Sequence, residues 1–450
     1  MKSLKYTLSI LIILLLFVFL IVPMGIGFWM QHSYQRIIDH IPTTPGFSAE
    51  ITQFSRGWFD SKATILLTSH GKAKDARYTI NMEIEQGPLI VTKAIDGSTH
   101  YLFALAKTIT TSEDINIKSI AIWHFNNVVD SKIFSKLASI KVANTSFSVK
   151  NLRGSTSFNR NKKSLKARIK AGSAQLAMQT SISTTPTSLL SATGINYAGN
   201  IHRIGLINYG KQLLQLDTLS IPANNKKICL LNNISVKSNI SKKDGATSIQ
   251  MTLIAQKIKN SQFGAKMLKA NFSFNDLNTK ALSEFLKTIR QQKLSTNNKL
   301  RITKPTLSLL RNGLSIKLNQ LNVGTAQGTV EATGTFNVPK RKENMGILQT
   351  IAQITAGFHF QAPKQWLLEQ VTNFYATQKS KQKNEALPQN KATTTIRNWQ
   401  AKNYLKSSGN YYVSTISFKN GKLNINGTIP NFHKPQKTQG SSTQFNKLQR

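Results

Sequence analysis

Residues 268–292 have the sequence LKANFSFNDLNTKALSEFLKTIRQQ, and this stretch decides the fold class. Its first part alternates apolar with polar residues around Phe272 and Phe274, which predicts a β-strand with one buried face. A short polar turn follows. The next apolar residues recur at the i, i+3, i+4, i+7 spacing of an amphipathic helix; they are Leu282, Phe285, Leu286 and Ile289. The stretch therefore predicts a strand that leads directly into a helix.

Residues 354–378, ITAGFHFQAPKQWLLEQVTNFYATQ, repeat this plan. Pro363 suits the first turn of the second helix, where an N–H is not needed. Two copies are too few to indicate a solenoid. The two units share an aromatic stripe, which we interpret either as core packing or as an apolar binding surface. Its residues are Phe272, Phe274, Phe285, Phe358, Phe360, Trp366 and Phe374.

The rest of the chain has mostly the period-two pattern of strands with one wet face, which is typical of antiparallel sheets. We expect strands at 48–55, 62–69, 76–85, 89–93, 101–107, 115–125, 140–150, 165–170, 175–183, 234–240, 248–256, 314–323 and 328–336. Asn420-Gly421 predicts a tight hairpin between 411–418 and 422–429. The polar, Lys-rich residues 378–394 predict a flexible connection. The expected fold is α+β and mostly β: an extended, curved antiparallel sheet with helices that cover one face or end.

The segment from Thr7 to Met30 has no charged side chain over 24 residues. As a helix it is long enough to cross a membrane. Lys2 and Lys5 precede it, so the positive-inside rule places the amino terminus in the cytoplasm and the body on the other side. The alternative is a cleavable signal peptide, although its apolar core would be shorter. No Ala-x-Ala follows, and only Gly25 and Gly27 imitate a weak cleavage site.

These patterns divide the chain into five parts. We expect a cytoplasmic head at 1–6, a transmembrane anchor at 7–30, a β-rich region at 31–260, a strand-helix region at 261–432 and a disordered tail at 433–450.

The formal net charge is +41, from 59 Lys and Arg against 18 Asp and Glu. No acidic residue occurs between Ser131 and Leu216. Such a field favours anionic partners such as membrane phosphates, acidic polysaccharide or nucleic acid. Among possible partners we expect anionic lipid, or else an envelope protein. The alternative is a compositional bias, since Lys, Asn and Ile are frequent throughout. Nucleic acid is disfavoured because the lysines do not lie around an aromatic stacking strand.

The stretch FSRGWFDS at residues 54–61 resembles the first-hairpin motif of the bacterial YdgA-like family. The matching residues are Phe54, Arg56, Gly57, Trp58, Phe59 and Ser61. The resemblance implies an inner-membrane anchor in a Gram-negative cell with a β-rich body in the periplasm, and it implies no catalytic residue. In physical terms, Gly57 suits a turn with positive φ. Trp58 and Phe59 are expected to fold back as a plug, which serves either packing or binding.

Motifs of common enzymes are absent from the sequence: no His-Glu-x-x-His, no Gly-x-Ser-x-Gly and no Walker loop occurs in a fitting context. The single Cys229 allows no intrachain disulfide and is expected to be a small buried apolar residue. We therefore expect no catalytic, metal or cofactor site. The expected function is a non-catalytic scaffold or lipid-handling surface at the inner membrane. The alternatives are a protein-interaction module of an envelope assembly and an envelope hydrolase.

Overall fold

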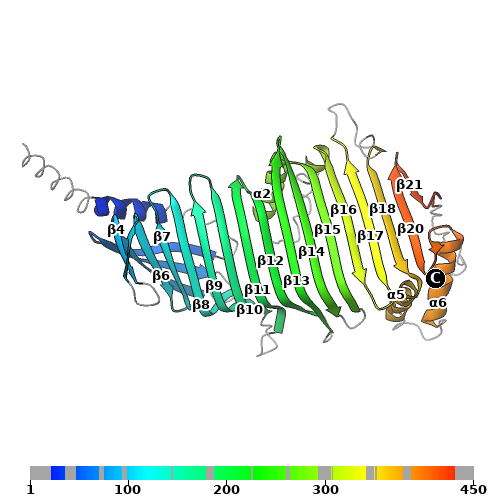
Figure 1. Cartoon of the computed structure of the whole chain (residues 1–450), viewed down its shortest axis with the longest axis horizontal. Helices are drawn as coiled ribbons and strands as arrows, with labels where there is room; N and C mark the ends of the chain where they lie inside the picture. Colours follow the sequence, from blue (N-terminus) through cyan, green and yellow to red (C-terminus); the bar gives the residue numbers. More distant parts are fainter. Residues whose placement is uncertain are drawn as a thin grey trace, which may run out of the picture.

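One antiparallel sheet of 19 strands makes up most of the protein (Figure 1). The computed structural model describes residues 22–35, 47–69, 76–93, 99–142, 145–178, 187–223, 227–259, 264–291, 306, 308–340, 349, 352–378 and 387–430. Almost every strand pairs with the strand that follows it, so the chain advances as a long up-and-down meander. Because each connection is local, the sheet grows in one direction and the molecule is elongated (Figure 1).

The first half of the sheet consists of β1 (Phe47–Arg56), β2 (Asp60–Ser69), β3 (Ala76–Gln86), β6 (Ala106–Ser112), β7 (Ile117–Trp123), β8 (Val128–Val142), β9 (Thr145–Asn159) and β10 (Ser164–Met178). The second half consists of β11 (Thr187–Ile204), β12 (Ile207–Ala223), β13 (Lys227–Lys243), β14 (Ala246–Lys259), β15 (Gly264–Asn278), β16 (Leu314–Gly324), β17 (Thr329–Val338), β18 (Thr355–Pro363), β19 (Lys406–Ser408), β20 (Tyr411–Lys419) and β21 (Lys422–Ile425). A separate hairpin joins β4 (Leu89–Lys93) to β5 (Thr99–Phe103).

The longer described helices lie at three places along the sheet. Residues 22–35 form a helix at the amino-terminal end. α2 (Thr279–Gln291) follows β15 and packs Leu282 against Tyr209 and Leu277. At the other end, α5 (Lys364–Gln378) and α6 (Pro388–Ala401) lie together beside β18 and β20 (Figure 1).

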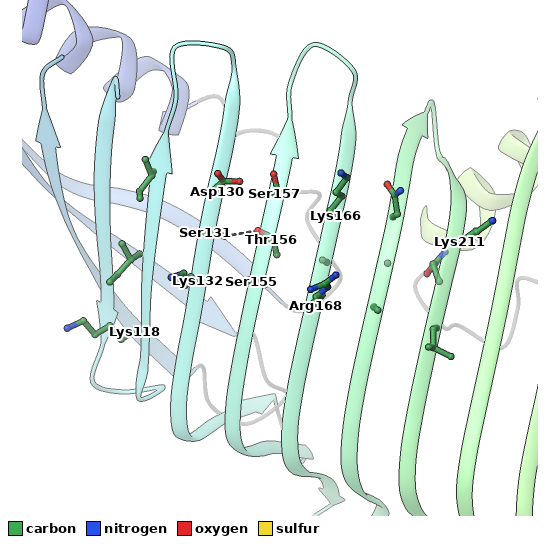
Figure 2. Close-up of a pocket in the computed structure, with 18 of the residues that line it drawn as sticks. Lys118, Asp130, Ser131, Lys132, Ser155, Thr156, Ser157, Lys166, Arg168 and Lys211 are labelled. Atoms are coloured by element: carbon green, nitrogen blue, oxygen red, sulfur yellow. Dashed lines mark hydrogen bonds between the residues drawn. The ribbon is translucent and has the colours of Figure 1, made fainter. Parts of the chain in front are cut away.

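A line of left-handed residues bends the sheet. Asn151 on β9, Gly194 on β11 and Asn233 on β13 have φ angles of 53°, 62° and 48°. The ladders skip pairs at the same level, for example between Thr193↔Thr218 and Asn196↔Gln215. Asn and Gly adopt this conformation at the least cost. The three residues lie near the middle of their strands, and the strands consequently bend together at this level. The bends are visible in the lower part of Figure 2.

Several sequence predictions are confirmed. The sheet is antiparallel, both strand-helix units occur as β15 with α2 and β18 with α5, and the Asn420-Gly421 turn joins β20 to β21. Other predictions are wrong. Residues 388–394 of the predicted flexible connection belong to α6, whereas residues 379–386 lie outside the described residues. The strand predicted at 140–150 spans the end of β8 and the start of β9, and the strand predicted at 101–107 spans the end of β5 and the start of β6. The strand predicted at 165–170 and the described part of the strand predicted at 175–183 both belong to β10. The predicted boundary after residue 260 falls between β14 and β15, which pair along most of their lengths in the same sheet.

The predicted anchor is only partly described. Residues 7–21 and the predicted tail at 433–450 lie outside the described residues. Within the described part of the chain, no helix is both long and apolar enough to cross a membrane. Residues 22–30 belong to the amino-terminal helix, and there Ile26 and Met30 are buried against the sheet.

Candidate functional site

The two faces of the long sheet differ in chemistry because consecutive residues of a strand point to opposite faces. Leu213 and Leu214 on β12 illustrate this. The registers place Leu213 in a row with Arg168 and Lys237, whereas Leu214 lies in a row with Tyr197 and Val236. We call the first face the cationic face and the second the apolar face.

One row of the apolar face can be followed from β8 to β18 through ten successive register pairs. Its residues are Ile133, Gly154, Ile169, Tyr197, Leu214, Val236, Leu253, Ala270, Leu321, Ala332 and Phe360. At about 4.8 Å between strands, the row is roughly 48 Å long. No charged residue interrupts it. We call it the apolar row.

The apolar row is not part of a closed core. Its larger side chains are all half-buried, and none of its members belongs to the three buried clusters of the described residues. In the next row of the same face, Met251 and Phe358 are each 38% exposed. Gly154 leaves room for the side chain of its neighbour in the row, because a Cβ on Gly154 would lie 2.7 Å from Ile133 Cγ2. The sheet therefore presents a long, accessible apolar surface.

The amino-terminal helix lies on the same face as the apolar row. The row continues from Ile133 through Ser119 and Thr110 to Met82. Met82 belongs to the buried cluster that includes Ile26 and Met30 of the helix. One end of the apolar row thus meets the helix that follows the charge-free amino-terminal segment.

The cationic face is hollowed into a trough of about 1670 Å³ that extends from β3 to β14. Figure 2 shows Lys132, Lys166, Arg168 and Lys211 along it, with Ser155 and Ser157 between them. The trough is lined by seven cations and two acids: Lys107, Lys118, Lys132, Lys166, Arg168, Lys211, Lys237, Glu85 and Asp130. Ile109, Ile120 and Ile122 lie at the end near β5.

The two acids of the trough already have partners. Lys107 Nζ lies 2.9 Å from Glu85 Oε1, and His124 Nε2 lies 3.0 Å from Asp130 Oδ2. Among the described residues, no carboxylate forms an ion pair with any of the other six cations. Their charge is therefore available to an anionic partner. The described residues also contain no group of three His, Cys, Asp or Glu side chains that could hold a metal ion.

The first-hairpin motif contacts the amino-terminal helix. The Arg56 guanidinium lies 3.6 Å from the centroid of the Phe28 ring, and Arg56 Nη1 donates to Gln31 Oε1 at 3.1 Å. Phe54 packs against the cluster of Ile26 and Met30. The buried Ser61 accepts a hydrogen bond from the Gln86 side chain. The first-hairpin motif therefore holds the amino-terminal helix against the sheet.

The expected aromatic plug is wrong. Gly57 does turn the chain between β1 and β2, with its N–H bonded to Asp60 O at 2.7 Å. Its φ lies outside the left-handed region, however, and Trp58 and Phe59 are 47% and 51% exposed. The β1–β2 turn leaves both rings at the surface.

The predicted aromatic stripe divides in the structure. Phe272, Phe274, Phe358 and Phe360 all lie in rows of the apolar face, and Phe274 is also covered by the cluster under α2. Phe285 on α2 and Trp366 on α5 are half-buried, and Phe374 on α5 is 57% exposed and contacts the Tyr375 ring. The four strand residues of the stripe therefore share one face of the sheet, whereas the three helix residues lie on α2 and α5. The predicted burial of Cys229 is also incomplete, because this residue is half-buried.

The sequence predictions missed both the apolar row and the trough. Neither β11 nor β12 was expected, and these strands connect the two halves of the apolar row and of the trough. The sequence does contain a pattern that indicates two different faces. Cations and apolar residues alternate along residues 165–169, so they point to opposite faces of one strand.

Comparison with known proteins gives a family and no activity. Neither the curated proteins nor the solved structures gave a match to this chain. A family model described as "Bacterial protein of unknown function (DUF945)" matches residues 1–431. The relation to YdgA-like proteins, expected from the hairpin motif, stays a prediction. Since the match covers nearly the whole sequence, the chain belongs to this bacterial DUF945 family.

Proposed function

We propose that the protein is a non-catalytic, membrane-anchored lipid-handling protein of the periplasm, which holds acyl chains against the apolar face. The apolar row is the observation that carries this proposal. One leaflet of a bilayer core is about 15 Å deep, half of the roughly 30 Å of the whole core. A row of roughly 48 Å therefore has room for the full length of an acyl chain.

The position of the helix at 22–35 supports the same proposal. If residues 7–30 begin in the inner membrane, the helix leads from the bilayer to one end of the apolar row. A lipid that leaves the outer leaflet would then reach an apolar surface without crossing a long polar gap. The cations of the body favour the neighbourhood of anionic headgroups.

The test uses two substitutions on neighbouring residues of β12. Leu214→Gln places an amide on the apolar face, and Leu213→Gln makes the same change on the cationic face. Full-length chain purified in detergent is delipidated, and binding of a fluorescent acyl-chain probe is measured. We expect wild type and Leu213→Gln to bind alike and Leu214→Gln to bind several-fold more weakly, with unchanged circular dichroism. Equal binding by all three proteins would refute the proposal.

A protein-interaction module is the alternative function. β1 pairs only with β2, so one edge of the sheet is open to a further strand among the described residues. This function would be preferred if crosslinking gave a single stoichiometric protein partner and the purified chain bound no acyl probe.

A further inference from the structure

From the trough on the cationic face we infer a second binding site, for a linear acidic polysaccharide that lies across the strands. This inference goes beyond the proposed lipid-handling function and does not depend on it, because the trough and the apolar row are on opposite faces of the sheet. Its basis is the arrangement of the cations, the neutral residues between them and the shape of the trough.

The trough cations are arranged in a line that runs across the strands. β6, β8, β10 and β12 each contribute at least one cation, namely Lys107, Lys132, Lys166 with Arg168, and Lys211. Cations on every second strand are roughly 10 Å apart, and the line from β6 to β13 is roughly 34 Å long. No two of these cations face each other directly in the registers, so repulsion between neighbours is limited. A partner with charges spread along a chain fits this line better than a single small anion does.

The residues between the cations are hydrogen-bonding side chains. Ser155 lies between Lys132 and Arg168, and Asn200 lies between Lys166 and Lys211. Asn239, Gln250 and Thr252 continue this pattern at the β13–β14 end. Hydroxyl and amide groups can bind the hydroxyl groups of sugars while the cations bind carboxylates.

Other polyanions fit the trough less well. A bilayer surface is flat, whereas the trough is concave. Proteins that bind single-stranded nucleic acids combine cations with aromatic rings on which the bases stack. Among the described residues that line the trough, Tyr101 at one end is the only aromatic one. An extended uronic-acid chain needs neither a flat surface nor a stacking ring.

The test compares two triple variants that lower the net charge equally. The trough variant carries Lys132→Gln, Arg168→Gln and Lys211→Gln. The control carries Lys162→Gln, Lys242→Gln and Lys243→Gln, which are exposed lysines that do not line the trough. Binding of polygalacturonate fragments of graded length to full-length chain is measured at low and high salt. The same proteins are also tested with four comparison ligands: galacturonate monomer, anionic phospholipid vesicles, polyglutamate and single-stranded DNA of matched charge.

We expect wild type and control to bind the fragments alike and the trough variant to bind them about tenfold more weakly or worse, with affinity falling as salt rises. Affinity should increase with fragment length until the chain spans the trough, and the monomer should bind weakly. Equal losses in the two variants would show a response to net charge alone and would overturn the inference. If the trough variant lost only the binding of vesicles, the site would be assigned to anionic lipid. If DNA or polyglutamate bound the trough more tightly than polygalacturonate does, the site would be assigned to that ligand. Either result would also overturn the inference.

Discussion

Arg56 shows how a single side chain connects the hairpin motif to the amino-terminal helix. Its guanidinium contacts the Phe28 ring and its N–H groups reach Gln31, so the motif has a mechanical role at the junction of helix and sheet. From the sequence, Arg56 was expected to matter only as part of a turn. The partner residues lie in a segment that the pattern assigned to a membrane anchor or to its continuation, and for this reason the contact was not foreseen.

Replacement of Arg56 should loosen the helix without unfolding the sheet. An exposed cation–π contact and one hydrogen bond contribute about 1 to 2 kcal/mol together. We expect Arg56→Ala to increase hydrogen exchange of residues 22–35 by several-fold, measured by mass spectrometry. Arg153→Ala removes an exposed arginine from β9 and serves as the control. Unchanged exchange at 22–35 in Arg56→Ala would contradict the assigned role.

Tyr34 makes the packing of the amino-terminal helix against the sheet sensitive to alkaline pH. Its hydroxyl lies 3.0 Å from Thr108 Oγ1, and burial raises the pKa of Tyr34 to about 12. The phenol of the undocked helix ionises near pH 10, whereas the docked phenol stays neutral. The contribution to stability is therefore complete below about pH 10 and is lost as pH rises toward about 12.

The Tyr34→Phe variant separates this titration from other alkaline effects. A shift of about two pKa units corresponds to about 2 to 3 kcal/mol. We expect the urea stability of wild type to fall more steeply between about pH 9 and pH 11.5 than that of Tyr34→Phe, by up to this amount. Parallel pH profiles for the two proteins would show that Tyr34 does not titrate as described.

At the scale of elements, the line of left-handed residues sets the curvature of the sheet. Gly194 has a φ of 62°, and a Cβ at this position would overlap the Asp217 side chain on β12. We expect Gly194→Ala to destabilise the protein by about 1 to 3 kcal/mol in urea unfolding.

Gly264→Ala is the matched control for this prediction, because no atom lies within 4 Å of a Cβ there and the backbone has no positive φ. It should change the free energy of unfolding by no more than about 0.5 kcal/mol. Equal stabilities of the two variants would show that the bend does not require a left-handed residue at Gly194.

The elements differ in how far the sequence predicts them. Asn420-Gly421 identified its hairpin correctly because both residues favour positive φ, and they adopt 52° and 73°. β11 was missed because Ala198, Gly199 and Asn200 weaken the strand pattern, although the neighbouring strands pair with them. α6 was missed because its polar composition hid Ala392 and Ile396, the two residues that it buries. For both missed elements, the deciding contacts are made with neighbouring elements and are not visible in the pattern of the element itself.

At the scale of the whole molecule, one meandering sheet separates two chemistries. The apolar row faces the side on which the amino-terminal helix lies, and the trough with its seven cations faces the other side. An antiparallel sheet with one wet face was predictable from the period-two pattern. The trough and the apolar row were not, because each depends on the register of ten or so strands, and register is not visible in any single strand.

Photo-crosslinking with a phospholipid that carries a diazirine on its acyl chain shows directly whether acyl chains lie on the apolar face. The full-length chain is labelled in membranes, and the modified residues are found by peptide mass spectrometry. We expect labels on apolar-row residues such as Leu214, Val236 and Leu253, and none on their neighbours Leu213, Lys237 and Thr252. Labels that fall equally on both faces, or only on the cationic face, would contradict this expectation.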